Sequence, residues 1–139
     1  MLLLIIKGKQ GEPCLFQFVF IHYNLIIYND KIIAMRIISY NVNGIRAAIK
    51  KGFFDWLKTN PADVICLQET KATQGDVDVK QLEALGYYHH WFSAQKKGYS
   101  GVAIFSKAKP DKVSFGNGYQ LSDFEGRVVR VDIGDLTIV

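Results

Sequence analysis

Hydrophobic residues after position 34 follow two spacings, one typical of buried strands and one typical of helices. The clearest strand signal is 63–67, where the consecutive apolar residues from Val64 to Leu67 predict a strand buried on both faces. Apolar positions between residues 45 and 57 recur at helical spacing and predict a helix that ends at Asn60 and Pro61. Gly52 lowers the stability of that helix by about 1 kcal/mol relative to Ala and is a candidate break.

The same patterns predict several further elements. Asp76 to Leu85 has the apolar spacing of a second, shorter helix, which Gly86 closes. Short apolar or alternating runs bounded by Gly, Pro, Asn or Asp predict strands. These strands cover residues 36–40, 87–95, 102–106, 112–115, 127–133 and 136–139. Strands interspersed with helices indicate an α/β protein.

Residues 1–34 differ from the rest and are interpreted as an atypical apolar extension outside the domain formed by residues 35–139. They show no clean helical or strand periodicity. The apolar run at 2–6 is too short for a signal peptide, and 14–28 falls short of the roughly 20 residues that a membrane span needs. One hypothesis is that Met35 is the genuine start. We therefore expect no membrane partner and a cytoplasmic location.

Composition sets limits on the class of protein. A chain of 139 residues, 49% hydrophobic and 22% charged, is long enough for one domain with a real core. Its net charge of +4 is compatible with a polyanionic partner but is weak evidence for one. Two cysteines, Cys14 and Cys66, give no disulfide framework, and no Cys/His cluster has the spacing of a zinc site.

A carboxylate follows the strongest strand directly. Glu69 comes after the strand at 63–67 and is followed by a cation, Lys71. Ligands of open α/β sheets bind beyond the carboxyl ends of the strands, so Glu69 occupies a position where chemistry is usually found. The alternative is an ordinary solvated loop carboxylate beside Lys71.

Polar groups also follow the strand at 36–40. The amide of Asn41 can donate to a phosphate oxygen without adding repulsion, although Asn41 and Asn43 are equally suited to turn chemistry. Arg46 adds a cation where the start of a helix already favours anions. Tyr99 lies in a basic, glycine-punctuated loop at 96–101 that would let backbone approach a phosphate, or that is a plain hairpin loop.

Four motifs in this order resemble the exonuclease III-like AP endonucleases of the endonuclease/exonuclease/phosphatase superfamily. The similarity runs from Met35 to the end of the chain. The motifs are Ser-Tyr-Asn-Val-Asn-Gly-Ile-Arg at 39–46, Leu-Gln-Glu-Thr-Lys at 67–71, Gly-Tyr-Ser-Gly-Val-Ala at 98–103 and Asp-Phe-Glu-Gly-Arg-Val-Val at 123–129.

The resemblance implies roles for two candidate catalytic residues. Glu69 is expected to be the carboxylate ligand of a catalytic Mg²⁺, with Mn²⁺ as a possible substitute, and Asn41 is expected to help organise the metal and the scissile phosphate. Mg²⁺ suits such a site because it takes one or two protein carboxylates and keeps its other positions for water and phosphate oxygens.

The resemblance also implies a set of DNA-binding residues. Asn43 stands where some family members carry Asp and is grouped with them. The cationic and aromatic residues suit contacts to the DNA backbone, so binding should follow shape or lesion and not base sequence. The set is Asn43, Arg46, Lys71, Tyr99 and Arg127.

The implied fold is the first half of a four-layer α/β/β/α sandwich, with two packed mixed β-sheets flanked by helices. The later family motifs are not found in the sequence, so a truncated chain that is inactive alone is expected. The implied whole enzyme is a Mg²⁺-dependent DNA-repair phosphodiesterase of the AP endonuclease or 3′–5′ exodeoxyribonuclease III type. It would be monomeric and act on double-stranded DNA with abasic sites or 3′ ends.

Three alternatives remain open at the level of sequence. The chain could be a non-catalytic DNA-binding fragment or a non-functional truncated gene product. A lipid or inositol phosphatase of the same superfamily is less favoured, because Gln-Glu-Thr-Lys and Glu-Gly-Arg point to the DNA-repair branch.

Overall fold

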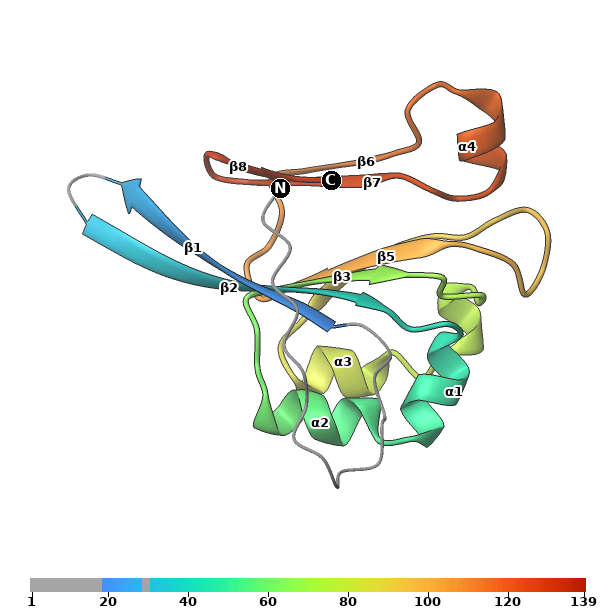
Figure 1. Ribbon diagram of the computed structural model, residues 1–139, viewed down its shortest axis with the longest axis horizontal. Coiled ribbons are helices and arrows are strands. Elements are labelled where there is room, and N and C mark those ends of the chain that lie inside the picture. Colours follow the sequence, from blue (N-terminus) through green and yellow to red (C-terminus); the bar gives the residue numbers. More distant parts are fainter. Residues whose placement is uncertain (1–18, 29–30) are drawn as a thin grey trace.

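Two β-sheets packed face to face, with helices on the outer face of the larger sheet, form the described part of the protein (Figure 1). This computed structural model describes the backbone of residues 19–28 and 31–139, and side chains from residue 35 onward. The larger sheet has the strand order β1-β2-β3-β5-β4. Its strands are β1 (Val19–Tyr28), β2 (Lys31–Asn41), β3 (Val64–Gln68), β4 (Tyr88–Phe92) and β5 (Val102–Ser106).

The smaller sheet and the helices complete the layers. Three antiparallel strands, in the order β6-β7-β8, cover one face of the larger sheet. The helices α1, α2 and α3 lie on its other face, whereas α4 lies at one end of the smaller sheet (Figure 1). The bounds are β6 (Lys112–Phe115), β7 (Val129–Ile133), β8 (Leu136–Ile138), α1 (Ile45–Lys50), α2 (Phe53–Thr59), the 3₁₀ helix η1 (Gln74–Asp76), α3 (Lys80–Ala84) and α4 (Gln120–Phe124).

Side chains of the central strands alternate between two cores, as the two-residue period of a strand requires. On the helix side, Ile38 of β2 and Ile65 of β3 pack with Phe53 of α2, and all three are fully buried. On the other side, Val64 of β3 packs with Val131 of β7. The continuous apolar run at 64–67 is explained because β3 is covered on both faces.

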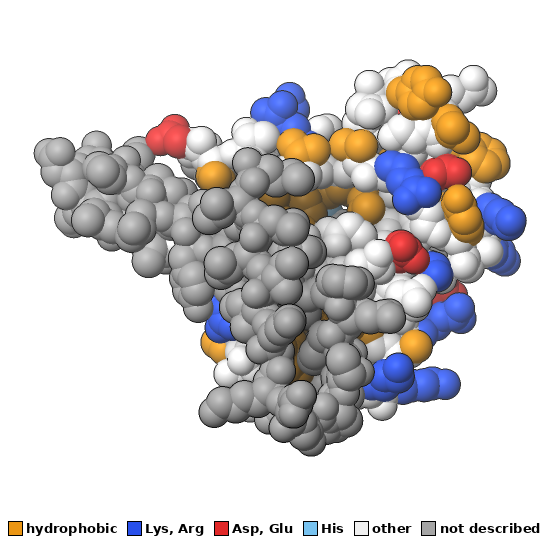
Figure 2. Space-filling model, in the orientation of Figure 1, with side chains coloured by type: hydrophobic (Ala, Val, Ile, Leu, Met, Phe, Trp, Pro, Cys, Tyr) orange, Lys and Arg blue, Asp and Glu red, His pale blue; other side chains and the backbone are white. Residues whose placement is uncertain are grey.

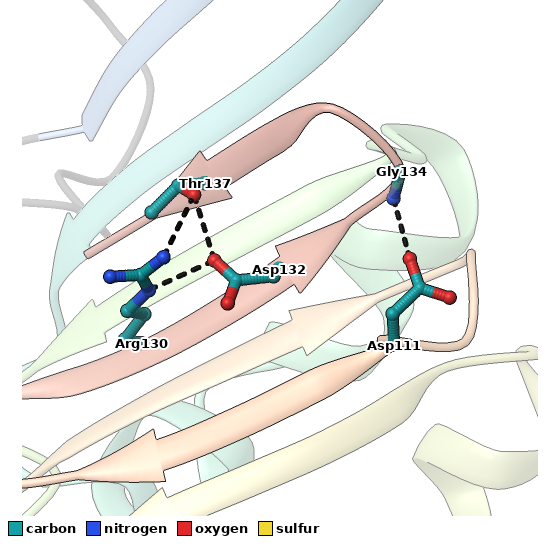
Figure 3. A network of polar contacts seen from close by, with 5 residues as sticks. All are labelled: Asp111, Arg130, Asp132, Gly134 and Thr137. Carbon is teal, nitrogen blue, oxygen red and sulfur yellow. Dashed lines mark hydrogen bonds and ion pairs between the residues drawn. The ribbon is translucent and has the colours of Figure 1, made fainter.

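The β7–β8 hairpin is held by polar contacts on the smaller sheet (Figure 3). Arg130 Nε donates to Asp132 Oδ1 at 2.9 Å, and the Thr137 hydroxyl donates to the same oxygen at 2.7 Å. The backbone N–H of Gly134 donates to Asp111 Oδ2 at 2.7 Å, which joins the hairpin turn to the residue before β6. Of these contacts, the one between Thr137 and Asp132 joins residues that are paired across the hairpin.

Two of the predicted helices have different bounds in the structure. The helix expected over 45–57 breaks at Gly52, whose φ of +94° is left-handed, so that α1 and α2 are separate. The helix expected from Asp76 begins at Lys80, because Asp76 instead closes η1 by accepting from Thr73, and Val77 is extended. Helix α4 was not predicted, since its five residues carry no helical apolar pattern.

The predicted α/β class is confirmed, with successive layers of helices, larger sheet and smaller sheet. Residues 19–28 form β1, which pairs antiparallel with β2. The separation of residues 1–34 from the domain stays a prediction, and residues 1–18 and 29–30 lie outside the described residues. Among the helices of the described part, none has the length and apolar character to cross a membrane.

Candidate functional site

The parallel pairing of β2 and β3 brings two polar turns together at one edge of the larger sheet. Asn41 lies opposite Gln68 in the register, so both strands end at the same level. The backbone pairing continues beyond the strands, because Gly44 N donates to Glu69 O at 2.8 Å and Ile45 N donates to Thr70 O at 2.9 Å. The turns at 41–44 and 69–71 are therefore fixed against each other before any side chain is considered.

Four side chains from these two turns form one polar network. Asn41 Nδ2 donates to Glu69 Oε1 at 2.9 Å, and Asn41 Oδ1 accepts from the backbone N–H of Asn43 at 3.0 Å. Lys71 Nζ lies 3.1 Å from Glu69 Oε2 and also donates to Asn43 Oδ1. Asn41 thus serves the turn, as one of the two interpretations expected, and its amide nitrogen also contacts the carboxylate; its role toward a phosphate or a metal stays a prediction.

The backbone at Glu69 and Lys71 is left-handed, with φ of +52° and +51°. This conformation costs a non-glycine residue about 1–2 kcal/mol, so surrounding contacts must hold it. Thr70 between them is buried, and its N–H donates to Gly101 O at 3.1 Å, while Lys71 N donates to Ser100 O at 2.8 Å. A Cβ at Gly101 would lie 2.6 Å from Thr70 Oγ1, so a glycine is what allows this close approach.

The Glu69 carboxylate is held in its charged form. The hydrogen bond from Asn41 lowers its pKa most, followed by the hydrogen bond from Lys71, with a further contribution from the charge of Arg127. Its side chain keeps 38% of its accessible surface, so the carboxylate remains open to a ligand.

A basic groove adjoins this network. Lys71 belongs to both, and three more cations, Arg46, Lys96 and Lys97, line the groove together with one carboxylate, that of Asp76. The residues that complete the lining are Ala72, Thr73, Ser93, Ala94, Gln95, Gly98 and Tyr99. Lys and Arg side chains gather at the right of Figure 2, where Figure 1 has α1 and the loop between β4 and β5. Such a groove suits a polyanion.

Arg127 contacts Tyr99 of the groove lining, and the Glu125 carboxylate contacts both residues. The guanidinium carbon of Arg127 lies 5.9 Å from the centroid of the Tyr99 ring. Arg127 Nε donates to Glu125 Oε2 at 2.8 Å, and this contact raises the pKa of Arg127. Arg127 is thus permanently charged and oriented.

The structure brings all of the predicted site residues to one end of the molecule. Asn41, Asn43, Glu69 and Lys71 share a network, whereas Arg46 and Tyr99 meet Lys71 in the groove lining. Arg127 contacts Tyr99. Their roles toward DNA and metal stay predictions.

Sequence reasoning missed two residues of this site. Thr70 supports the turn, and Glu125 holds Arg127. Both stand inside the quoted motifs, but a motif alone gives no sign of which side chain supports another.

The donor set fits a hard divalent cation that takes a single protein carboxylate. Glu69 supplies charged oxygens that each retain a free lone pair, and the amide oxygen of Asn41, which accepts one hydrogen bond from Asn43 N, also retains a lone pair. Among the described residues, no three His, Cys, Asp or Glu side chains are placed to share an ion. These donors fit a hard divalent cation that takes its remaining ligands from water and phosphate oxygens.

Comparison with known proteins identifies the family. Residues 38–139 match the family described as Endonuclease/Exonuclease/phosphatase family. An exodeoxyribonuclease of Bacillus subtilis (strain 168) is 45% identical over 106 residues, which cover 76% of this chain and 41% of that protein. A DNA-(apurinic or apyrimidinic site) endonuclease of Dictyostelium discoideum is 37% identical over 105 residues, covering 76% of this chain and 29% of that protein.

A solved structure agrees with these relatives. The 3′ phosphatase NExo (D146N) from Neisseria, bound to a product DNA hairpin, superposes with a TM-score of 0.64 at 31% identity, covering 75% of this chain and 39% of that one. This chain therefore belongs to the endonuclease/exonuclease/phosphatase family, among relatives that are exodeoxyribonucleases and AP endonucleases. It spans less than half the length of the proteins it matches here.

Proposed function

We propose that this chain forms part of a Mg²⁺-dependent DNA-repair phosphodiesterase that acts on double-stranded DNA at abasic sites or 3′ ends. The observation that carries the proposal is the network of Asn41, Glu69 and Lys71 at the paired ends of β2 and β3, directly beside a basic groove. The relatives' names support this substrate class. The intact protein is proposed to be a cytoplasmic monomer, which size-exclusion chromatography and cell fractionation would test.

Each group in the site has a definite task in this proposal. Arg46, Lys71, Tyr99 and Arg127 bind backbone phosphates, with Asn43 orienting Lys71. Asn41 lowers the pKa of Glu69 and leaves its carboxylate open to a cation.

Glu69 and Asn41 would hold Mg²⁺, for which Mn²⁺ could substitute. When bound, such an ion supplies Lewis-acid stabilisation of charge on phosphate oxygens. The protein's own cations add electrostatic stabilisation of the same charge.

A second candidate function is DNA binding without cleavage by the 139-residue polypeptide. It is favoured by the contrast between a groove lined by four cations and a network with a single carboxylate. Most of the rate in phosphate chemistry comes from positioning and charge stabilisation by several groups together, so this polypeptide tested alone should bind far better than it cuts.

A duplex carrying an abasic-site analogue tests both functions. Binding, followed by fluorescence anisotropy without divalent metal, should weaken steeply with salt. Arg46→Ala should reduce both the affinity and the salt dependence. Lys58→Ala, which removes an equal charge from α2 outside the groove lining, should change affinity much less.

Incision in Mg²⁺ is the second measurement. Any product formed should disappear in Glu69→Gln while binding persists. Binding without product would favour the second function, and a chain that shows neither salt-dependent binding nor Mg²⁺-dependent product would contradict both.

A further inference from the structure

Glu125 is a carboxylate near the basic groove, and it contacts two of the residues expected to bind DNA. Arg127 Nε donates to Glu125 Oε2 at 2.8 Å, and Arg127 Nη2 lies 2.8 Å from the same oxygen. The Tyr99 hydroxyl donates to the other oxygen, Oε1, at 3.4 Å. One carboxylate therefore connects the loop before β5 with the residue that precedes β7 by two positions.

The Tyr99 ring adds a second connection between the same residues. The Arg127 guanidinium lies 5.9 Å from the ring centroid, and Lys96 Nζ lies 5.4 Å from it. Cations near an aromatic face are attracted by its quadrupole, so the ring attracts both cations. The Arg127 side chain is 46% exposed, whereas the Glu125 side chain is only 22% exposed. Glu125 is thus the more enclosed partner, and Arg127 faces outward.

The backbone fixes the place of Glu125. Its N–H donates to Leu121 O at 3.1 Å at the end of α4, and its carbonyl accepts from Gly101 N at 3.4 Å. The next residue, Gly126, has φ of +61°, and a Cβ there would lie 2.6 Å from Phe92 O. The chain at 125–126 is therefore seated between the end of β4 and the Tyr99 loop, and Glu125 is held independently of Arg127.

We propose that Glu125 is a positioning residue for DNA binding, which holds Arg127 and Tyr99 toward the phosphate backbone. The inference rests on the proposed function, because it assigns a task within the same DNA-binding surface. A carboxylate near phosphates would otherwise repel them. Neutralising Glu125 therefore distinguishes two roles. Affinity for DNA rises if Glu125 only repels phosphates, and it falls if Glu125 positions Arg127 and Tyr99.

The test is the affinity of the 139-residue chain for the abasic-site duplex, without divalent metal. Glu125→Gln should raise Kd about three- to fivefold at about 0.1 M salt, because an exposed ion pair contributes this much binding free energy. It should also reduce the salt dependence by up to about one counterion as Arg127 disengages. Asp55→Asn is the matched control, because it removes the same charge from an exposed pair with Lys58 on α2, and its Kd should stay equal or fall.

Two further variants separate positioning by Glu125 from repulsion of the phosphates. Glu125→Asp keeps the charge and shortens the reach, so affinity should fall if Glu125 positions and stay unchanged if it only repels. In an Arg127→Ala and Tyr99→Phe background, Glu125→Gln should cause no further loss. The inference would be overturned if Glu125→Gln bound at least as tightly as wild type. It would also be overturned if Glu125→Asp bound as tightly as wild type.

A measurement without DNA separates this inference from the proposed function. The Arg127 Nε–H signal in NMR spectra of the free chain should be protected from exchange and should lose that protection in Glu125→Gln. An unchanged signal would overturn the positioning role whatever the chain binds. Failure of the wild-type chain to bind the duplex would instead overturn the proposed function.

Discussion

Glu69 shows how neighbouring side chains favour the ionised form of a carboxyl group. Glu69 has two anchors, Asn41 on one oxygen and Lys71 on the other, and both favour the ionised form. The sequence alone offered a solvated loop carboxylate as the alternative. The structure instead favours an oriented carboxylate. The Glu69 backbone is left-handed, and the Glu69 side chain accepts a hydrogen bond from the Asn41 amide.

Asn41→Ala should raise the pKa of Glu69 toward its ordinary value, because the largest cause of the lowered pKa is lost. A pH titration of the Glu69 side-chain carboxyl ¹³C signal measures this directly. Lys58→Ala is the control, since it removes a charge that pairs with Asp55 and not with Glu69. An unchanged Glu69 pKa in Asn41→Ala would contradict this account.

Close contacts between elements also depend on single residues. Gly101→Ala should destabilise the fold by about 2–4 kcal/mol, because a left-handed alanine costs about 1–2 kcal/mol and its Cβ would also collide with Thr70 Oγ1. Gly118→Ala is the matched control, with φ of +83° against +85° but nothing within 4 Å of the added Cβ. Urea unfolding measures both free energies. Equal losses would show that the contact with Thr70 carries no cost.

Phe53 is one of three buried residues of the helix α2; it is fully buried and stacks with Tyr40 and Trp56. Phe53→Ala should cost about 3–5 kcal/mol, the usual loss for a buried phenylalanine. Phe124→Ala on α4 should cost far less, since Phe124 is 46% exposed. Urea unfolding of the two variants tests this, and a comparable loss for both would contradict the assignment of the core.

Acid should weaken the β7–β8 hairpin through Asp132. Hydrogen bonds from Arg130 first, and then from Thr137, lower the pKa of this carboxyl below its ordinary value (Figure 3). A lowered folded-state pKa contributes stability above the unfolded pKa, and that contribution is lost as pH falls through the folded-state value.

Asp132→Asn should therefore lower Tm at about pH 6, and its difference from wild type should shrink toward about pH 3. Thermal unfolding across that range checks the trend. A difference in Tm that stays constant with pH would contradict it.

At the scale of the whole molecule, the sequence predicted the central strands well and the connections less well. The apolar run at 64–67 and the strand at 102–106 were found because burial on both faces leaves a continuous apolar pattern. The start of the second helix was misplaced because Asp76 is used in a cap, and periodicity does not report caps. Helix α4 was not predicted because its five residues are too few to show a helical apolar repeat.

The candidate site was likewise predicted in part. Residues that carry the chemistry, such as Glu69 and Arg127, were named from motifs resembling a known family. Residues that hold them, Thr70 and Glu125, became visible only through burial and contacts. These supporting contacts depend on which loops lie side by side in the fold. A local sequence pattern does not predict which loops these are.

The central claim is that Glu69, at the paired ends of β2 and β3, holds a divalent cation beside a basic groove. The most direct measurement is a Mn²⁺ titration of the ¹⁵N-labelled chain, followed by paramagnetic broadening of its NMR signals. The account predicts early broadening at Asn41, Glu69 and their neighbours, which Glu69→Gln abolishes and Asp55→Asn leaves intact. Broadening that avoids this turn, or that is unchanged in Glu69→Gln, would contradict the claim.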